Sequence, residues 1–383
     1  MHLLEGAGDR EEALKAFAAE HVAPCAAQID REERIPPGVI ASLARAGILA
    51  SGFPECFGGP TGSDRDPVSA ALDHGLIHEA LGRVSASVQG LVNVHHMAGS
   101  AIARWGTRVQ KESWLPKLTS GELLAAVAVT EPNVGSDAGA VETRATRDGA
   151  DYVVTGAKCW ITCGQIAGVF VLLAGSDEGP VALLLPKAHP NLRIEPITGI
   201  LGCRGYMLAR LSLDACRLTP EHVLARPGFG LTHVVGTALD SGRYNLAWGC
   251  VGLAQACLSA ALDYSAERRQ FGSPLADFQL VQRMICRMAT DTHAARLMCW
   301  RAGELRGRRD PRAVKEATMA KYFASTMVNR VAYDALQIHG ANGCGAGYPL
   351  ERFFRDARIM ELIEGSSQIL EVAIARYACQ DRS

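Results

Sequence analysis

The sequence of 383 residues lacks several features that would assign it to a narrow class of proteins. No apolar run reaches the roughly 20 residues that a helix needs to span a bilayer, so we expect no membrane segment. Neither sign of charge is in excess, because 39 basic side chains accompany 40 acidic ones, and this argues against nucleic acid or an anionic membrane as a partner. No Gly-x-Gly-x-x-Gly joins a strand to a helix, so a dinucleotide-binding Rossmann unit is not predicted.

The twelve cysteines also lack the spacing of a metal site. No Cys-x-x-Cys pair occurs, and Cys159 with Cys163 has no second pair of ligands, so we expect no bound metal. The cysteines are scattered, and no secretory signal precedes them. We therefore expect reduced, buried thiols in a cytoplasmic protein rather than disulfides.

The pattern of apolar residues changes twice along the chain and divides it into three parts. Residues 1–124 repeat apolar side chains at helical spacing and predict an N-terminal α-helical domain. Residues 125–227 consist of short β-rich runs separated by turns, typical of a β-barrel or sandwich. Residues 228–383 return to long helical periodicities and predict a C-terminal four-helix bundle. The predicted fold class is therefore α+β.

Near the C-terminus, the run Glu364-Gly365-Ser366 is a candidate catalytic element. A carboxylate beside a glycine and hydroxyls at a helix end can reach a substrate carbon and act as a general base. The same run also suits a helix C-cap followed by the N-cap of the next helix. Taken alone, the run leaves both interpretations open.

Other segments of the chain, in matching order and spacing, resemble the acyl-CoA dehydrogenase family, flavoenzymes that oxidise acyl thioesters. The segments that carry this resemblance are Pro54–Gly59, Gly106–Glu122, Val129–Asp137, Lys158–Thr162, Arg268–Gly272 and Gln337–Gly343, followed by the Glu364 run. Because they extend over essentially the whole chain, the resemblance implies the family's three-domain fold and its FAD cofactor.

The resemblance assigns flavin contacts to two segments of the middle domain. These contacts are Val129, Thr130, Gly135 and Ser136 in the first segment, and Trp160 and Thr162 in the second. Gly135 allows close approach of the backbone, and the Trp160 indole offers a flat face to the flavin ring. The alternative for Trp160 is packing in the core.

Two further segments resemble the family's contacts to the FAD of a neighbouring subunit. Arg268, a permanently charged bidentate donor, would bind the flavin diphosphate, although a solvated helix face is the alternative. Phe271, Gln337 and Gly340 would lie near the adenosine end of the same cofactor. Sharing FAD in this way implies a homodimer or homotetramer. Ser366 and Gln368 would also lie near the cofactor.

The implied mechanism is removal of a proton from the thioester α-carbon by Glu364 and hydride transfer from the β-carbon to flavin. Burial would raise the pKa of Glu364 toward neutrality, which suits a base that acts on a weak carbon acid. Arg243 aligns with a family arginine near the active site and would orient the base or the substrate. A salt bridge at the start of a helix is the alternative for Arg243.

Departures from the family pattern bear on the substrate. Ile363 replaces the tyrosine that often precedes the catalytic glutamate, and Cys344 takes the place of phenylalanine in the family's Gly-Phe-x-x-x-Tyr-Pro loop. Cys344 and the segments Gly202–Ala209, Gly228–Gly230 and Arg243–Cys250 resemble a polyketide-pathway subgroup, which acts on short acyl groups of an acyl carrier protein on the route to hydroxymalonyl and methoxymalonyl units. The alternative is a short-chain acyl-CoA dehydrogenase.

A flavin-dependent monooxygenase or oxidase on the same fold is a further alternative, as is a flavoprotein without catalysis, although retention of Glu364 argues against both. The electron acceptor would be another flavoprotein or oxygen.

Overall fold

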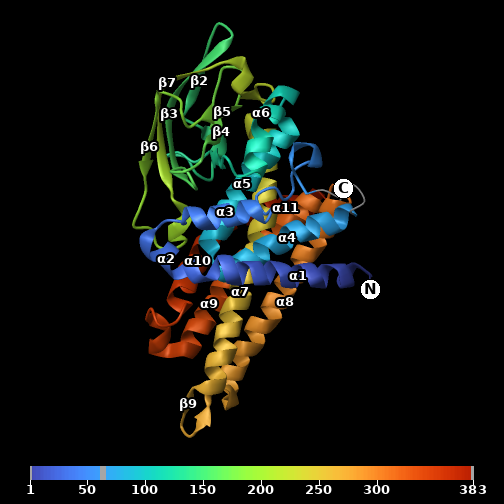
Figure 1. Cartoon of the computed structure of the whole chain (residues 1–383), viewed down its shortest axis with the longest axis vertical. Coiled ribbons are helices and arrows are strands. Elements are labelled where there is room, and N and C mark those ends of the chain that lie inside the picture. Colours follow the sequence, from blue (N-terminus) through green and yellow to red (C-terminus); the bar gives the residue numbers. More distant parts are fainter. Residues whose placement is uncertain (1, 61–65, 381–383) are drawn as a thin grey trace.

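The computed structural model describes residues 2–60 and 66–380. All its described strands but the β9/β10 hairpin gather at one end of an elongated molecule, and long helices extend from there to the other end (Figure 1). A helical N-terminal part, a β-rich middle part and a helical C-terminal part follow one another along the chain. The predicted α+β fold is therefore confirmed.

The N-terminal part is helical, and its helix α5 lies buried between its neighbours α4 and α6 and the rest of the molecule. The elements are α1 (His2–His21), α2 (Ala26–Glu32), α3 (Pro37–Arg45), α4 (Pro67–Val84), α5 (Ala86–Trp105) and α6 (Arg108–Thr119), with short turns η1 (Ala23–Cys25) and η2 (Glu55–Phe57). Local signals set their starts: the Ser85 hydroxyl accepts from the Val88 N–H at α5, and Thr107 with Gln110 forms a capping box at α6. Helix α5 is buried over most of its length, so its side chains face other elements on all sides.

The middle part is a sandwich of two four-stranded sheets, with strand orders β1-β4-β5-β8 and β2-β3-β7-β6. The strands are β1 (Ala125–Ala128), β2 (Arg144–Asp148), β3 (Asp151–Ile161), β4 (Val169–Ala174), β5 (Val181–Pro186), β6 (Leu192–Pro196), β7 (Ala209–Leu218) and β8 (Val223–Leu224), with turns η3 (Ala138–Ala140), η4 (Arg204–Tyr206) and η5 (Pro220–His222).

Strand β4 is buried on both faces. Phe170 and Leu172 pack into the core between the sheets, and Val169 and Val171 pack into the helical core that contains α5. A strand covered on both sides has a continuous apolar sequence instead of an alternating one. This packing fixes the sandwich against the helices.

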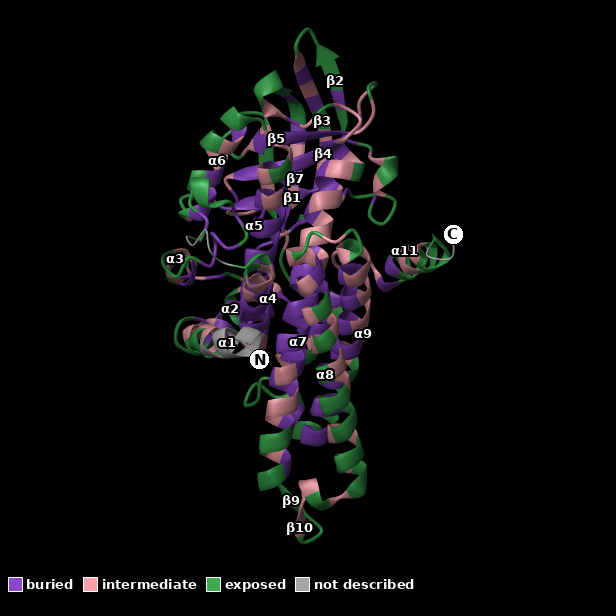
Figure 2. Cartoon of the chain, turned by 90° about the vertical axis from the view of Figure 1, so that its right-hand side faces the viewer, coloured by how far each residue is buried: buried purple, intermediate pink, exposed green. Residues whose placement is uncertain are grey.

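The C-terminal part is built on three long helices, α7, α8 and α9. The elements are η6 (Gly230–Val235), α7 (Gly236–Glu267), β9 (Arg269–Gln270), β10 (Ser273–Pro274), η7 (Leu275–Asp277), α8 (Gln279–Gly307), α9 (Ala313–His339), η8 (Gly340–Cys344), α10 (Leu350–Met360) and α11 (Ser367–Gln380). The far ends of α7 and α8, next to the β9/β10 hairpin, are largely exposed (Figure 2).

Helix α7 continues the short helical segment η6 as one long apolar helix. The continuous helical segment Gly230–Glu267 is long and apolar enough to span a membrane by length and composition. Within the structure, however, 72% of its most apolar window is buried against other helices. It is therefore the core helix of the bundle, and its hydropathy reflects that position.

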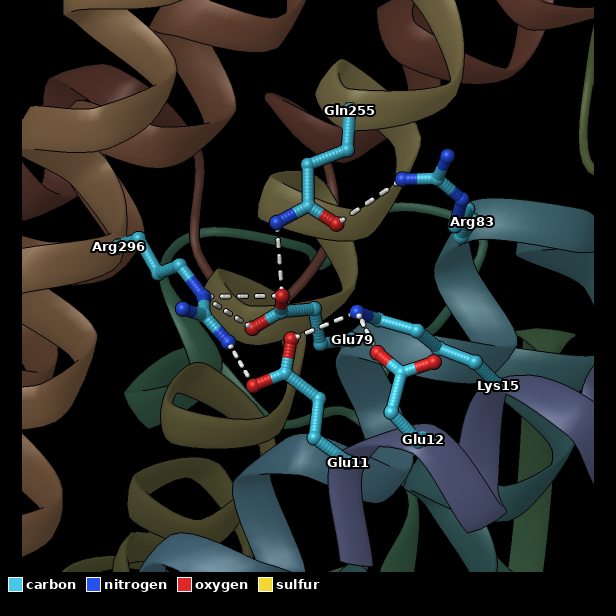
Figure 3. Close-up of polar contacts among 7 residues, drawn as sticks. All are labelled: Glu11, Glu12, Lys15, Glu79, Arg83, Gln255 and Arg296. Carbon is cyan, nitrogen blue, oxygen red and sulfur yellow. Dashed lines mark hydrogen bonds and ion pairs between the residues drawn. The ribbon is translucent and has the colours of Figure 1, made fainter. Parts of the chain in front are cut away.

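A cluster of charged side chains fastens α1 to this bundle (Figure 3). Arg296 of α8 lies 2.7 Å from Glu11 of α1 and 3.0 Å from Glu79 of α4. Gln255 of α7 donates to the same Glu79 carboxylate at 2.7 Å. Glu79 is thus a nearly buried carboxylate that accepts hydrogen bonds from side chains of two other helices.

All twelve cysteines lie in described segments and are free thiols. The expectation that they are buried is wrong for four of them, Cys56, Cys286, Cys344 and Cys379, which are exposed.

Candidate active site

Glu364 lies in the turn between α10 and α11. Both Glu364 and Gly365 have positive φ, at 56° and 95°, and the turn is held from two helices. The Arg243 Nε of α7 donates to the Glu364 carbonyl at 3.2 Å, and the Lys321 Nζ of α9 donates to the Gly365 carbonyl at 2.7 Å. The Ser366 hydroxyl accepts a long hydrogen bond from the Ile369 N–H, so this serine also caps the start of α11. Arg243 therefore positions the Glu364 backbone rather than forming a salt bridge at the helix start.

The Glu364 carboxylate is pressed against α7 and α5. A Cβ atom at Gly242 would lie 2.6 Å from its Oε2 and 2.7 Å from the Met97 sulfur, so only glycine fits there. Oε2 is shielded from solvent and has no hydrogen-bond partner. Burial raises the pKa of Glu364 to about 7, against the opposing effects of Arg243 and Lys321. The carboxyl group can therefore gain or lose a proton near neutral pH.

The two middle-domain segments lie side by side. Val129 and Thr130 directly follow β1, and both carbonyls accept from β3: Lys158 Nζ bonds Val129 at 3.0 Å, and the Cys159 N–H bonds Thr130 at 2.9 Å. Lys158 also lies 2.7 Å from the carboxylate of Glu131, and both side chains are buried. The sequence showed these two charges within the matched segments but gave no sign that they pair.

Trp160 is exposed, so its alternative role in the core is wrong. Its side chain is 54% exposed, and its φ of 61° lies in the left-handed region, where a register shift interrupts the pairing of β3 with β7. A large aromatic residue held open by a strained backbone indicates a functional position. Thr162 follows two residues later and is partly exposed, and Gly135 and Ser136 are exposed in the loop after β1.

A connecting segment joins this region to the Glu364 region. The Cys163 N–H donates to the Tyr206 carbonyl at 2.8 Å, and the Cys203 N–H donates to the Asp356 carboxylate of α10 at 2.5 Å. Tyr206 itself is buried, and its phenol oxygen lies beside the Cys203 thiol without a hydrogen bond of ordinary geometry. The stretch from Cys203 to Tyr206 therefore spans the distance between the sandwich and the bundle.

The other predicted contacts lie far from Glu364. Arg268 ends α7, twenty-five residues after Arg243, which places it about 37 Å farther along the helix. Phe271 is 96% exposed beside it. Gln337 and Gly340 lie at the same end of the bundle, because His339 stacks on Tyr264 of α7 with ring centroids 4.2 Å apart. Ser366 and Gln368, in contrast, lie next to Glu364 at the start of α11.

The described residues bring together one group with the composition of a metal site, His74, His78 and His96, whose nearest ligand atoms all lie within 4.8 Å of one another. Their nitrogens also have hydrogen-bond partners. Gln89 Nε2 lies 3.3 Å from His78 Nδ1, His78 Nε2 lies 3.3 Å from His96 Nδ1, and His96 Nε2 lies 3.0 Å from the Ile48 carbonyl. Neutral tautomers satisfy this chain without a metal, so the absence of a metal stays a prediction.

The residues around Trp160 fit a flavin. An open indole face, the backbone of Val129 and Thr130, and the hydroxyls of Ser136 and Thr162 offer the stacking and hydrogen bonds that an isoalloxazine ring needs. The unpaired Glu364 carboxylate supplies a separate proton acceptor.

Comparison with known families accounts for most of the chain. Residues 9–122, 126–216 and 228–378 match the N-terminal, middle and C-terminal domains of acyl-CoA dehydrogenases. The chain is 35% identical to the human mitochondrial short-chain specific acyl-CoA dehydrogenase over 94% of this chain and 87% of that protein. It is 38% identical to acryloyl-CoA reductase (NADH) of Anaerotignum propionicum over 94% of this chain and 91% of that protein.

Solved structures agree with this. Butyryl-CoA dehydrogenase of Megasphaera elsdenii superposes with a TM-score of 0.92 at 28% identity, covering 97% of both chains. FkbI, described for biosynthesis of the methoxymalonyl extender unit of the FK520 polyketide, superposes with a TM-score of 0.86 at 32% identity, covering 97% of this chain and 99% of that one. The chain therefore belongs to the acyl-CoA dehydrogenase family, oxidoreductases that act on the CH–CH group of acyl thioesters.

Proposed function

We propose that this protein oxidises a short acyl thioester at its α and β carbons, with Glu364 as the catalytic base and FAD as the resident cofactor. The observation that carries the proposal is the Glu364 carboxylate, buried against Gly242, without a hydrogen-bond partner on Oε2 and with a pKa near 7. A base that faces a weak carbon acid works best when its pKa lies near the operating pH.

In this mechanism the Cα–H and Cβ–H bonds break and a C=C bond forms. Glu364 takes the α-proton, and the Glu364 main-chain N–H holds the thioester carbonyl, so that negative charge on its oxygen is stabilised. Arg243 and Lys321 fix the turn that presents both groups. Bound FAD would accept the hydride from the β-carbon, and Val129, Thr130, Gly135, Ser136, Trp160 and Thr162, with Ser366 and Gln368, would hold it.

The comparisons favour CoA as the carrier of the acyl group. A short-chain acyl-CoA dehydrogenase and an acryloyl-CoA reductase match the chain at 35% and 38% identity. Our interpretation of an acyl carrier protein substrate in polyketide extender-unit biosynthesis has support from FkbI alone among the four named relatives. We therefore place a short-chain acyl-CoA first and the carrier protein second. Electrons would then pass to an electron-transferring flavoprotein or to oxygen.

The separation of Arg268 from Glu364 supports a homo-oligomer. Arg268 lies about 37 Å from Arg243 along α7, and Phe271, Gln337 and Gly340 lie at the same end of the bundle, so we infer that they do not contact a flavin held by Trp160 of the same chain. Phe271 and Leu280 are 96% and 68% exposed at this end, where a second chain would cover them. These four residues would then bind the FAD of the neighbouring subunit.

Anaerobic mixing of the purified, FAD-loaded protein with butyryl-CoA tests the proposal. Bleaching of the flavin absorbance without oxygen indicates dehydrogenation. A flavin that stays oxidised with every short acyl-CoA and acyl carrier protein thioester, and changes only when oxygen is present, would favour the monooxygenase or oxidase alternative instead.

A further inference from the structure

Several buried polar atoms near the proposed active site lack hydrogen-bond partners. Among them are Glu364 Oε2, the Tyr206 phenol oxygen and Asn93 Oδ1. Asn93 and Tyr206 are 1% and 3% exposed, so bulk water does not reach them freely. The catalytic mechanism uses Glu364 but gives no role to Asn93 or Tyr206.

Helix α5 places these atoms in a row. Gly90, Asn93 and Met97 are spaced three and four residues apart, so they share one face of the helix. At the Met97 end, the methionine sulfur and Glu364 Oε2 both border Gly242. At the Gly90 end, a Cβ atom on the glycine would lie 2.8 Å from the Tyr206 phenol oxygen. Asn93 lies between the two ends.

The row has the length of a short acyl chain. Seven residues separate Gly90 from Met97, which is roughly 10 Å along α5, and Asn93 stands about 6 Å from Met97. An acyl group whose α-carbon meets Glu364 and whose chain follows this face therefore passes Asn93 beyond its β-carbon and approaches Tyr206 at its end.

A plain alkyl chain is a poor match for the polar groups of Asn93 and Tyr206. It would leave the polar atoms of Asn93 and Tyr206 without hydrogen-bond partners in a part of the protein that bulk water does not reach freely. A hydroxyl both donates and accepts, so it can pair with the Asn93 amide in either orientation and with the phenol. A carboxylate cannot donate a hydrogen bond to Asn93 Oδ1.

We infer that the acyl group of the substrate carries a hydroxyl, or a similar group that donates and accepts hydrogen bonds, beyond its β-carbon, and that Asn93 and Tyr206 bind it. This inference rests on the proposed function, because it assumes that Glu364 marks the α-carbon. It makes Asn93 and Tyr206 specificity-determining residues for a reaction whose chemistry Glu364 performs.

The test compares anaerobic flavin reduction of the FAD-loaded protein by butyryl-CoA and by 4-hydroxybutyryl-CoA, measured as the reduction rate constant divided by the half-saturating concentration. We expect the hydroxylated substrate to be preferred by on the order of 10-fold or more, because rejection of an analogue that leaves polar groups unpaired is strong. Tyr206→Phe and Asn93→Leu should each lower this ratio on the order of 10-fold by slowing only the hydroxylated substrate.

Tyr244→Phe is the matched control. Its phenol is also buried, but it donates to the Ala71 carbonyl away from this row, so the ratio should not change. Equal use of both substrates by the unaltered protein, or a ratio that Tyr206→Phe leaves unchanged, overturns the inference and leaves the proposed function standing. If neither substrate bleaches the flavin, the proposed function fails and the inference falls with it.

Discussion

The Lys158 ammonium and the Glu131 carboxylate form an ion pair with an N···O distance of 2.7 Å, and both side chains are almost completely buried. Lys158 also donates to the Val129 carbonyl, and Glu131 accepts from the Thr143 N–H at 2.9 Å. Burial alone would raise the pKa of Glu131, but the hydrogen bonds from Lys158 and Thr143 lower it below its usual value. The pair therefore connects the strand that carries Trp160 to the loop that carries Val129 and Thr130.

Replacing Lys158 with methionine should damage both stability and the flavin site. Removing one partner of a buried pair leaves an uncompensated charge, and the expected loss is about 3–5 kcal/mol in the free energy of unfolding. FAD affinity should fall as well, because the Val129 carbonyl loses its donor. Urea unfolding and FAD titration measure the two effects. Lys187→Met removes a lysine that also bonds a carbonyl but at the surface, and it should change neither quantity. Unchanged stability in Lys158→Met would show that the pair carries no net energy.

Flavin reduction should depend on the ionisation of Glu364. Because burial raises the pKa of Glu364 to about 7, the proton-accepting form is scarce at pH 5.5 and predominates at pH 8.5. The anaerobic reduction rate should therefore rise with pH through a midpoint near 7. Glu364→Gln should retain FAD yet reduce it on the order of 10²-fold or more slowly, without this midpoint. A Gln variant with a near-normal rate would assign the base elsewhere.

The same pKa shift predicts how stability depends on pH. The folded-state pKa is raised above the ordinary value of 4.5, so the folded protein resists ionisation of Glu364. Its favourable contribution is present below pH 4.5 and is lost as the pH rises through about 7. The Glu364→Gln variant has no such group, so its free energy of unfolding relative to the unaltered protein should increase between pH 5 and pH 8. Urea unfolding of both proteins without FAD at the two pH values measures the difference. A difference that does not change with pH would mean that the carboxylate is well solvated.

Arg268→Ala should weaken FAD retention and subunit assembly together. The guanidinium group can bind a diphosphate through two parallel hydrogen bonds, and a cofactor held by two chains stabilises their association. Fluorescence titration of FAD and sedimentation velocity report the two effects. Arg269→Ala is the neighbouring control, because Arg269 is also exposed but bonds the Gly272 carbonyl of its own hairpin. If both quantities survive the Arg268 change, the side chain is only a surface charge.

The sequence was sufficient for the architecture because its signals are local or lie in matched segments. Helical periodicity, short β-rich runs and the order of the motifs together predicted the three-part fold, and the glycine after Glu364 indicated the turn that presents it. The exposure of Trp160 could not be predicted, because it depends on the left-handed backbone and on the register shift between β3 and β7.

Other features depend on contacts between distant segments. Asn93 and Tyr206 are 113 positions apart in the chain, and only the packing of α5 against the segment after β6 makes both relevant to Glu364. The Lys158 and Glu131 pair and the histidine chain are likewise tertiary. The hydropathy of α7 is also ambiguous without tertiary contacts, because a helix surrounded by other helices can have the same hydropathy as one surrounded by lipid.

The distance between Arg268 and Arg243 along α7 has a genetic consequence. In the proposed arrangement each cofactor site takes Glu364 and Trp160 from one chain and Arg268 from another. Two alleles, one defective at Glu364 and the other at Arg268, would therefore complement each other in a mixed assembly, since some sites would receive both intact contributions. Each allele expressed alone would be inactive, so the inherited unit of activity would be the pair of chains rather than the single polypeptide.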